Sequence, residues 1–313
     1  MHPGGNIRGR VRTGEKTMAI SLGSMMTLGA ALVTGAALLT GCGSDDPDPV
    51  SSGSTTTTDT GTTTSTNTGT NTGTQGASTY VLVHGAWGAA WHWDRTREML
   101  EAEGHEVVAM DLPAHGDDMT PVADASLQAY TDSVVAELDA AAEPVILVGH
   151  SMAGMVISQA AEARPEKVRT LVYLAAYLVQ DGQSLLDIVE ADAGAQLGPY
   201  LVFSQDGSEA ALMPEAMGAV FCDDCSAADL AELEAQLRPE PVAPLGTPIT
   251  VSEAGWGSVP RVYIETSNDK VLSPAMQEQL YTAIPCDQVL SLDSSHAAFL
   301  SVTEELVGHL LSL

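Results

Sequence analysis

The segment Gly149-His150-Ser151-Met152-Ala153 places a serine directly after a short apolar run and before a helical pattern. A serine on a sharp turn from a strand into a helix presents its hydroxyl to a substrate. The small residues Gly149 and Ala153 allow strand and helix to approach closely, and the helix directs its positive end at the reacting centre. The spacing alone also arises by chance in many chains. Its position between a strand and a helix is what predicts that Ser151 is a nucleophile.

A serine hydroxyl is a weak nucleophile and needs a neighbouring base. The chain has eight histidines, and His296 lies in a short loop between the last apolar run and the last helical pattern. That loop falls at the carboxyl edge of the predicted sheet, where Ser151 also lies. We therefore expect His296 to take the proton of the serine.

The histidine in turn needs a carboxylate that orients its ring and stabilises its charged form. Asp269 follows the apolar run at residues 262–266 and lies at the same edge of the predicted sheet. Glu265 and Asp293 are competing candidates. Glu265 falls within the strand, and Asp293 is too close to His296 in the chain to reach round to the far ring nitrogen. These considerations favour Asp269.

Acyl transfer also requires N–H donors for the oxyanion that forms on the attacked carbonyl. We expect one donor from the backbone of Met152, directly after the nucleophile, and one from Ala86, in the loop after the first strand. A site of this kind hydrolyses an ester in two steps through an acyl-enzyme. It is predicted to need no metal and no organic cofactor.

Short apolar runs alternate with helical patterns along residues 79–313, which is typical of a parallel sheet covered on both faces. Strands are expected at residues 79–83, 106–110, 145–148, 168–174, 262–266 and 288–292, and helices at residues 93–103, 126–141, 152–163, from 274, and at the end of the chain. The predicted fold class is α/β, with a doubly wound, mostly parallel sheet of about six strands. Residues 177–257, here called the lid segment, break the alternation and are expected to form a helical lid.

These motifs together resemble the branch of the α/β-hydrolase family that contains plant methyl-ester esterases, hydroxynitrile lyases and many bacterial esterases. The resemblance covers residues 79–313 and depends on segments at residues 84–93, 102–116, 148–156, 257–274 and 293–300, with a partial match at 225–239. It implies the α/β-hydrolase fold, a catalytic triad and two oxyanion donors, at Ser151, Asp269, His296, Ala86 and Met152.

Two departures from the resemblance affect the expected reaction. The hydroxynitrile lyases carry a lysine directly after the catalytic histidine and a threonine beside the first-strand histidine, whereas this chain has Ala297 and Gly85 there. The resemblance therefore implies a serine carboxylesterase for small to medium, uncharged esters. A lipase, thioesterase or lactonase would use the same triad. A non-catalytic surface-binding lipoprotein is a third alternative, disfavoured by the intact spacing of the triad.

The charge of the chain excludes one class of partner. It has 41 acidic and 12 basic residues, a net charge of −29. Such a chain repels phosphate backbones, so nucleic-acid binding is not expected.

The amino-terminal residues resemble a bacterial lipoprotein signal. Basic residues within 1–16 precede a weakly apolar stretch at 18–40, and Leu39-Thr40-Gly41-Cys42 follows the pattern in which the bond before the cysteine is cut. Lipidation of Cys42 is the expected result. An uncleaved transmembrane helix is the alternative, and the many Gly, Ser, Thr and Ala residues disfavour it.

Three regions follow from this interpretation: a signal peptide at 1–41, a lipidated cysteine with a disordered Ser/Thr/Gly tether at 42–78, and a hydrolase domain at 79–313. The protein is expected to be exported and anchored by lipid to a bacterial membrane. Gly43 after the lipidated cysteine favours the outer membrane or cell surface.

The other cysteines lie outside the predicted triad. Cys222 and Cys225 flank two aspartates in the lid segment. Because an exported protein meets oxidising conditions, a local disulfide is favoured, with two free thiols as the alternative. Cys286 is then unpaired.

Overall fold

Six strands, each parallel to its neighbours, form the main sheet. The computed structural model describes residues 76–313. The strands lie in the order β2-β1-β3-β4-β8-β9. Their bounds are β1 (Thr79–Val83), β2 (Glu106–Met110), β3 (Val145–His150), β4 (Val168–Leu174), β8 (Arg261–Thr266) and β9 (Gln288–Leu292). The predicted doubly wound α/β sheet of about six strands is confirmed.

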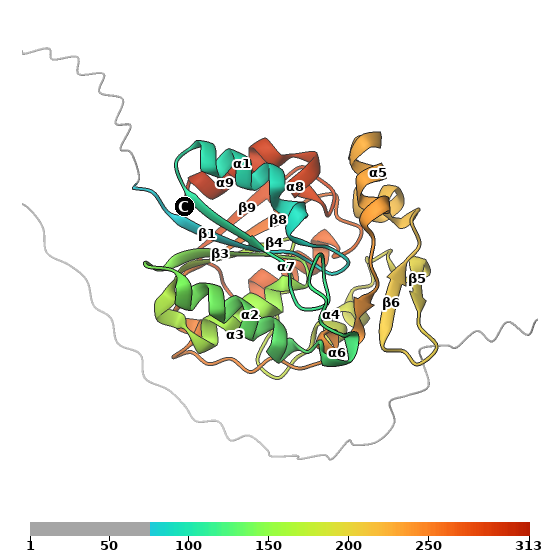
Figure 1. The fold of residues 1–313 in the computed structure, drawn as a ribbon, viewed down its shortest axis with the longest axis horizontal. Helices are drawn as coiled ribbons and strands as arrows, with labels where there is room; N and C mark the ends of the chain where they lie inside the picture. The colour runs from blue at the N-terminus through green and yellow to red at the C-terminus, as the bar shows by residue number, and fades with distance from the viewer. Residues whose placement is uncertain (1–75) are drawn as a thin grey trace, which may run out of the picture. The chain divides into compact units, whose positions relative to one another are not determined.

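Helices cover both faces of this sheet (Figure 1). One hydrophobic core lies under α2, α3 and α7, and a second lies under α1, α8 and α9. The helices are α1 (Asp94–Ala102), α2 (Leu127–Ala140), α3 (Ala153–Ala163), α7 (Pro274–Ala283), α8 (Ala298–Ser301) and α9 (Thr303–Leu311). Short 3-10 turns lie at Ala90–Trp93, Val122–Asp124, Pro165–Lys167, Gly198–Tyr200 and Trp256–Ser258. A sheet buried on both faces requires continuously apolar strands, and β3 is buried at every position.

The lid segment contains helices, as expected, and also a second sheet that its sequence pattern does not predict. The helical parts are α4 (Leu185–Ala191), a π-helical turn (Met217–Phe221), α5 (Ala227–Gln236) and α6 (Val242–Leu245). Three antiparallel strands lie in the order β5-β6-β7, with bounds β5 (Leu201–Phe203), β6 (Glu209–Leu212) and β7 (Glu240–Pro241). Strands of two to four residues are too short to show an alternating pattern, so no sequence pattern predicts them.

The predicted signal peptide, Cys42 and most of the tether lie outside the described residues. Among residues 76–313, no helix combines the length and the apolar character needed to cross a membrane.

Gly149 allows β3 and α3 to meet at a tight turn, and Gly154 allows the start of α3 to pack against the segment after β4. A Cβ on Gly149 would lie 2.9 Å from the carbonyl oxygen of Ala153. A Cβ on Gly154 would lie 2.5 Å from the carbonyl oxygen of Tyr177. Real Cβ atoms do not approach backbone oxygens this closely, so both contacts depend on the absence of side chains at these positions.

We predict that Gly154→Ala lowers the free energy of unfolding by about 1–3 kcal/mol, because the added methyl forces backbone to move in a packed core. Gly308→Ala is the matched control, since nothing lies within 4 Å of its added methyl in helix α9. The control should be neutral or more stable by up to about 1 kcal/mol, as alanine favours helix. Denaturant unfolding of the two full-length variants measures the difference, and equal stabilities would contradict the packing argument.

Three buried histidines lie in the core beneath the carboxyl edge of the sheet. His84, His92 and His150 are each at most 3% exposed. The ring of His92 stacks on Phe299 at 4.6 Å, and its Nδ1 has no partner among the described residues. Burial, together with the positive charge that His296 and His115 would carry, lowers the pKa of His92 to about 3. Burial also lowers the pKa values of His84 and His150 well below their ordinary value.

We predict that stability falls as the pH drops below about 6.5. In that range the unfolded chain binds protons at these histidines while the folded chain does not, so acid favours unfolding. For His92 alone the loss between pH 7 and pH 5 is about 2 kcal/mol by linkage. Denaturant unfolding at both pH values tests this. His92→Phe should reduce the loss of unfolding free energy between pH 7 and pH 5 by about 2 kcal/mol. His309→Gln, near the end of α9, is the control and should not reduce it.

Candidate active site

Ser151 follows β3 directly and has an unusual backbone conformation. Its φ angle is 54°, in the left-handed region that residues with side chains seldom adopt. Its N–H donates to the carbonyl of Leu174 at 3.1 Å, and its carbonyl accepts from Gly154 at 3.0 Å and Tyr177 at 3.1 Å. These bonds hold the strained residue between strand and helix. Such strain recurs at functional sites, and here it presents the serine at the carboxyl edge of the sheet.

Asp269 and His296 form a buried pair. The Nδ1–H of His296 donates to Oδ2 of Asp269 at 2.7 Å, and both side chains are fully buried. Four other groups donate to the same carboxylate: Val271 N–H (2.7 Å), Leu272 N–H (3.0 Å), Thr266 Oγ1 (2.9 Å) and Gln277 Nε2 (3.3 Å). A buried carboxylate requires such donors, and together they fix its position relative to the imidazole.

The other ring nitrogen of His296 is available for chemistry. Because Nδ1 carries the hydrogen donated to Asp269, Nε2 is the unprotonated nitrogen of the neutral ring. It is buried and has no hydrogen-bond partner among residues 76–313. The backbone carbonyl of His296 accepts from Nε2 of His150 at 2.9 Å. This bond ties His296 to the residue that directly precedes Ser151.

The competing carboxylates have other partners. Oδ1 of Asp293 accepts from Asn268 at 2.7 Å and from Ser267 at 3.3 Å, at the surface. Glu265 accepts from the hydroxyl of Tyr281 at 3.0 Å. Neither carboxylate bonds to His296, so Asp269 is the acid that the structure pairs with the imidazole.

The residues expected to supply the two oxyanion donors are both buried. Met152 follows Ser151 in the chain, and Ala86 lies in a loop that packs against Ser151. Ala86 is 6% and Met152 is 1% exposed. Among the backbone hydrogen bonds of turns, loops and helix caps in residues 76–313, the N–H groups of Ala86 and Met152 donate none. A Cβ on Gly85 would lie 2.8 Å from Cβ of Ser151, so the loop that carries Ala86 packs directly against the serine. A threonine at position 85, as in the lyases, would not fit here without movement.

Glu240, which no sequence motif marks, lies next to this loop. Its Oε2 accepts from the N–H of Trp87 at 3.0 Å and from Nε2 of His115 at 2.8 Å. Glu240 is fully buried, and His115 is 1% exposed. Burial opposes protonation of His115, but the charge and hydrogen bond of Glu240 outweigh it and raise the pKa of His115. Glu240 thus connects β7 of the lid segment to the loop after β1, through Trp87, and to the loop after β2, through His115. No local pattern could reveal it, since the two residues are 125 positions apart.

The cysteines of the lid segment are bonded to each other. Cys222 and Cys225 form a disulfide, with 5.2 Å between their Cα atoms. Asp224 lies close enough to both sulfurs to suggest a metal site, and no other such cluster occurs in residues 76–313. With both sulfurs in the disulfide, however, the cluster offers no thiolate ligand. Cys286 is free and partly buried, and burial raises its pKa to about 12.

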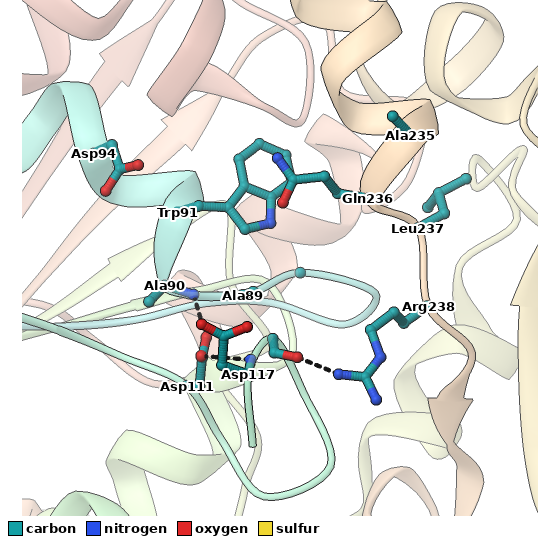
Figure 2. A pocket seen from close by; sticks show the side chains of 12 residues that line it. Ala89, Ala90, Trp91, Asp94, Asp111, Asp117, Ala235, Gln236, Leu237 and Arg238 are labelled. Atoms are coloured by element: carbon teal, nitrogen blue, oxygen red, sulfur yellow. Dashed lines mark hydrogen bonds between the residues drawn. The ribbon is translucent and has the colours of Figure 1, made fainter. Parts of the chain in front are cut away.

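A pocket with a volume of about 430 Å³ lies between the segment after β1, the loop after β2 and the carboxyl end of α5. Figure 2 shows side chains that line it. Asp111 in its wall accepts from the N–H of Ala90 at 2.7 Å and of Asp117 at 2.9 Å, and Arg238 donates to the carbonyl of Gly116. Asp111 therefore stabilises the two loops that these residues belong to. None of the residues predicted for catalysis lines this pocket. Ser151 itself is only 6% exposed.

Comparison with known families and proteins identifies the fold. Residues 80–309 match the model of the alpha/beta hydrolase family. A putative chloroplastic methylesterase 11 of Arabidopsis thaliana is 32% identical over 75% of this chain, and the chain spans 63% of that relative's length. Salicylic acid-binding protein 2 of Nicotiana tabacum is 30% identical, covering 75% of this chain and 96% of the relative.

Solved structures agree with this result. Polyneuridine aldehyde esterase is 25% identical and superposes with a TM-score of 0.68, covering 75% of this chain and 98% of the other. A pyrethroid hydrolase from Sphingobium faniae is 29% identical and superposes with a TM-score of 0.68, and the match covers 75% of this chain and 96% of the hydrolase. The chain thus belongs to the alpha/beta hydrolase family, in its methylesterase-like branch of esterase-type hydrolases.

Proposed function

We propose that the protein is a serine carboxylesterase in which Ser151 is the nucleophile, His296 the general base and Asp269 the orienting acid. The observation that carries this proposal is the buried Asp269–His296 hydrogen bond, which leaves Nε2 of His296 without a partner. A histidine held in this tautomer has one remaining acceptor atom. The bond from His150 to the backbone carbonyl of His296, which links the loop of His296 to the residue before the strained serine, supports the proposal.

The reaction proceeds in two steps. Nε2 of His296 takes the proton of Ser151 as its Oγ attacks the ester carbonyl, and Asp269 stabilises the imidazolium that forms. The N–H groups of Ala86 and Met152 donate to the oxyanion. The imidazolium then protonates the departing alcohol. Water repeats the sequence on the acyl-enzyme, and the acid leaves with the serine restored.

We propose small to medium, uncharged esters as substrates. The net charge of −29 repels anionic substrates at long range. The named relatives include methylesterases and a pyrethroid hydrolase, which supports an ester. Ala297 and Gly85 stand where the lyases have their lysine and threonine, which disfavours cyanohydrin chemistry. Ser151 is enclosed, so we further propose that substrate enters when the lid segment moves.

We predict that a fluorophosphonate probe labels the full-length chain and that Ser151→Ala abolishes the labelling. His296→Ala should remove nearly all of it. Asp269→Asn should lower kcat for a short-chain p-nitrophenyl ester by about 10⁴-fold, because the imidazole loses its orienting acceptor. Asp293→Asn, which changes the competing carboxylate, is the matched control and should stay within about threefold of the parent.

No labelling and no turnover in a folded parent chain would contradict the proposal and favour a binding protein. If Asp293→Asn lost its activity while Asp269→Asn kept it, Asp293 and not Asp269 would be the orienting acid. The rate across acyl chain lengths separates a carboxylesterase from a lipase, since only the latter should prefer long chains.

We also propose that residues 1–41 are removed, that Cys42 carries lipid and that residues 42–78 tether the hydrolase domain to a membrane. The supports are the basic start, the weakly apolar stretch and the cysteine that follows Leu39-Thr40-Gly41. On this proposal the enzyme is exported, with the outer membrane or cell surface favoured.

We predict that mass spectrometry of the protein purified from bacterial membranes finds a mature chain that starts at a lipidated Cys42. Cys42→Ala should shift the protein from the membrane fraction and leave it without lipid, whereas Cys286→Ala should not change either property. An intact Met1, or an unmodified Cys42 in the parent chain, would contradict the anchor.

A further inference from the structure

The disulfide-closed turn Cys222–Cys225 lies beside the loop that carries His296. The turn follows the π-helical turn Met217–Phe221 and precedes α5, within the lid segment. Cys222 is fully buried, whereas Asp223 and Asp224 between the two cysteines are exposed. The disulfide closes a loop of only four residues and so restricts the directions in which these two carboxylates can point.

Asp224 binds the residue that directly precedes His296. Its Oδ2 accepts from the backbone N–H of Ser295 at 2.9 Å, and its Oδ1 accepts from the Ser295 hydroxyl. Ser295 is fully buried. Both carboxylate oxygens thus hold one residue at two points, its backbone and its side chain. A carboxylate that accepts two hydrogen bonds in this way fixes orientation as well as distance.

The same segment also touches the imidazole. The ring of Phe221, directly before the disulfide, lies 5.1 Å from the ring of His296 in an edge-to-face arrangement. Phe221 is 3% exposed. The lid segment therefore contacts His296 through one side chain and holds the neighbouring backbone through another. The imidazole is in a loop, so neither a helix nor a strand fixes its position.

We propose that Asp224, held in place by the Cys222–Cys225 disulfide, is a positioning residue for His296. This inference rests on the proposed function, in which Nε2 of His296 must reach the hydroxyl of Ser151. A displacement of about 1 Å in such a group costs on the order of 10²-fold in rate. The bond from Asp224 to Ser295 joins the lid segment to the loop between β9 and α8, so the placement of the base depends on the lid.

Asp223 provides a matched control from the same turn. It forms an ion pair with Lys270 at 2.5 Å, and about a third of each side chain is exposed. Exposed pairs of this kind contribute little, because solvent screens them. Replacing Asp223 therefore removes an aspartate from the same turn while the bonds from Ser295 to Asp224 stay intact.

The test compares Asp224→Ala, Asp224→Asn and Asp223→Ala with the full-length parent. We predict that Asp224→Ala lowers kcat and the rate of fluorophosphonate labelling about 10-fold or more, with KM within about threefold. Asp224→Asn keeps one acceptor oxygen for Ser295 and should lose less. Asp223→Ala should stay within twofold. Hydrogen exchange at the Ser295 amide should accelerate in Asp224→Ala only, and thermal unfolding verifies that each variant is folded.

A folded Asp224→Ala variant with kcat and labelling within twofold of the parent would overturn the proposal. Equal losses in Asp223→Ala would also overturn it, because they would indicate general damage to the turn. If the folded parent neither labels nor hydrolyses the ester, the proposed function fails. Exchange at the Ser295 amide would then still test whether Asp224 holds this loop.

The role of the disulfide is tested separately, with the double variant Cys222→Ala, Cys225→Ala. Without the bridge the turn can move away from Ser295. We predict a fall in kcat in the same direction as in Asp224→Ala but smaller, with faster exchange at the Ser295 amide. Unchanged kcat and unchanged exchange in a folded double variant would overturn the role of the disulfide, because Asp224 would then keep its position without the bridge.

Discussion

The buried carboxylate of Asp269 is the constraint on which the rest of the site depends. Taking an ionised carboxylate out of water is costly unless donors replace the water. Four of its five donors come from residues 266–277, directly around the end of β8. These contacts are local in sequence and form as the turn folds. The fifth donor, His296, arrives from the loop after β9, and the parallel pairing of β8 with β9 brings it there.

The strained serine is a second constraint, and it depends on packing. Ser151 keeps its positive φ because strand β4, helix α3 and the residue Tyr177 close around it with backbone hydrogen bonds. The close contacts of Gly149 and Gly154 show that this arrangement leaves no free volume. On the proposed mechanism the site is therefore preorganised: the proposed nucleophile and the imidazole are each held by groups that do not take part in the reaction.

The sequence predicted the main sheet and the triad candidates because both have local signatures. Continuous apolar runs mark the six strands, and Ser151, Asp269 and His296 each follow a strand at the same edge. Contacts made by the lid segment have no such signature. Glu240 meets His115 across 125 positions, and Asp224 meets Ser295 across 71. Strands β5 to β7 are too short for an alternating pattern, so only the folded chain brings these residues together.

These long-range contacts indicate that the lid segment does more than cover the site. Glu240 binds the N–H of Trp87, next to the proposed oxyanion donor Ala86, and Asp224 binds Ser295, next to the proposed base His296. The lid segment therefore contacts the neighbour of a proposed oxyanion donor through Glu240 and the neighbour of the proposed base through Asp224. Substitutions in a lid usually alter the pocket and hence KM. On the proposed mechanism, a substitution that moves either carboxylate should also change kcat, because it displaces a group that would act in the transition state.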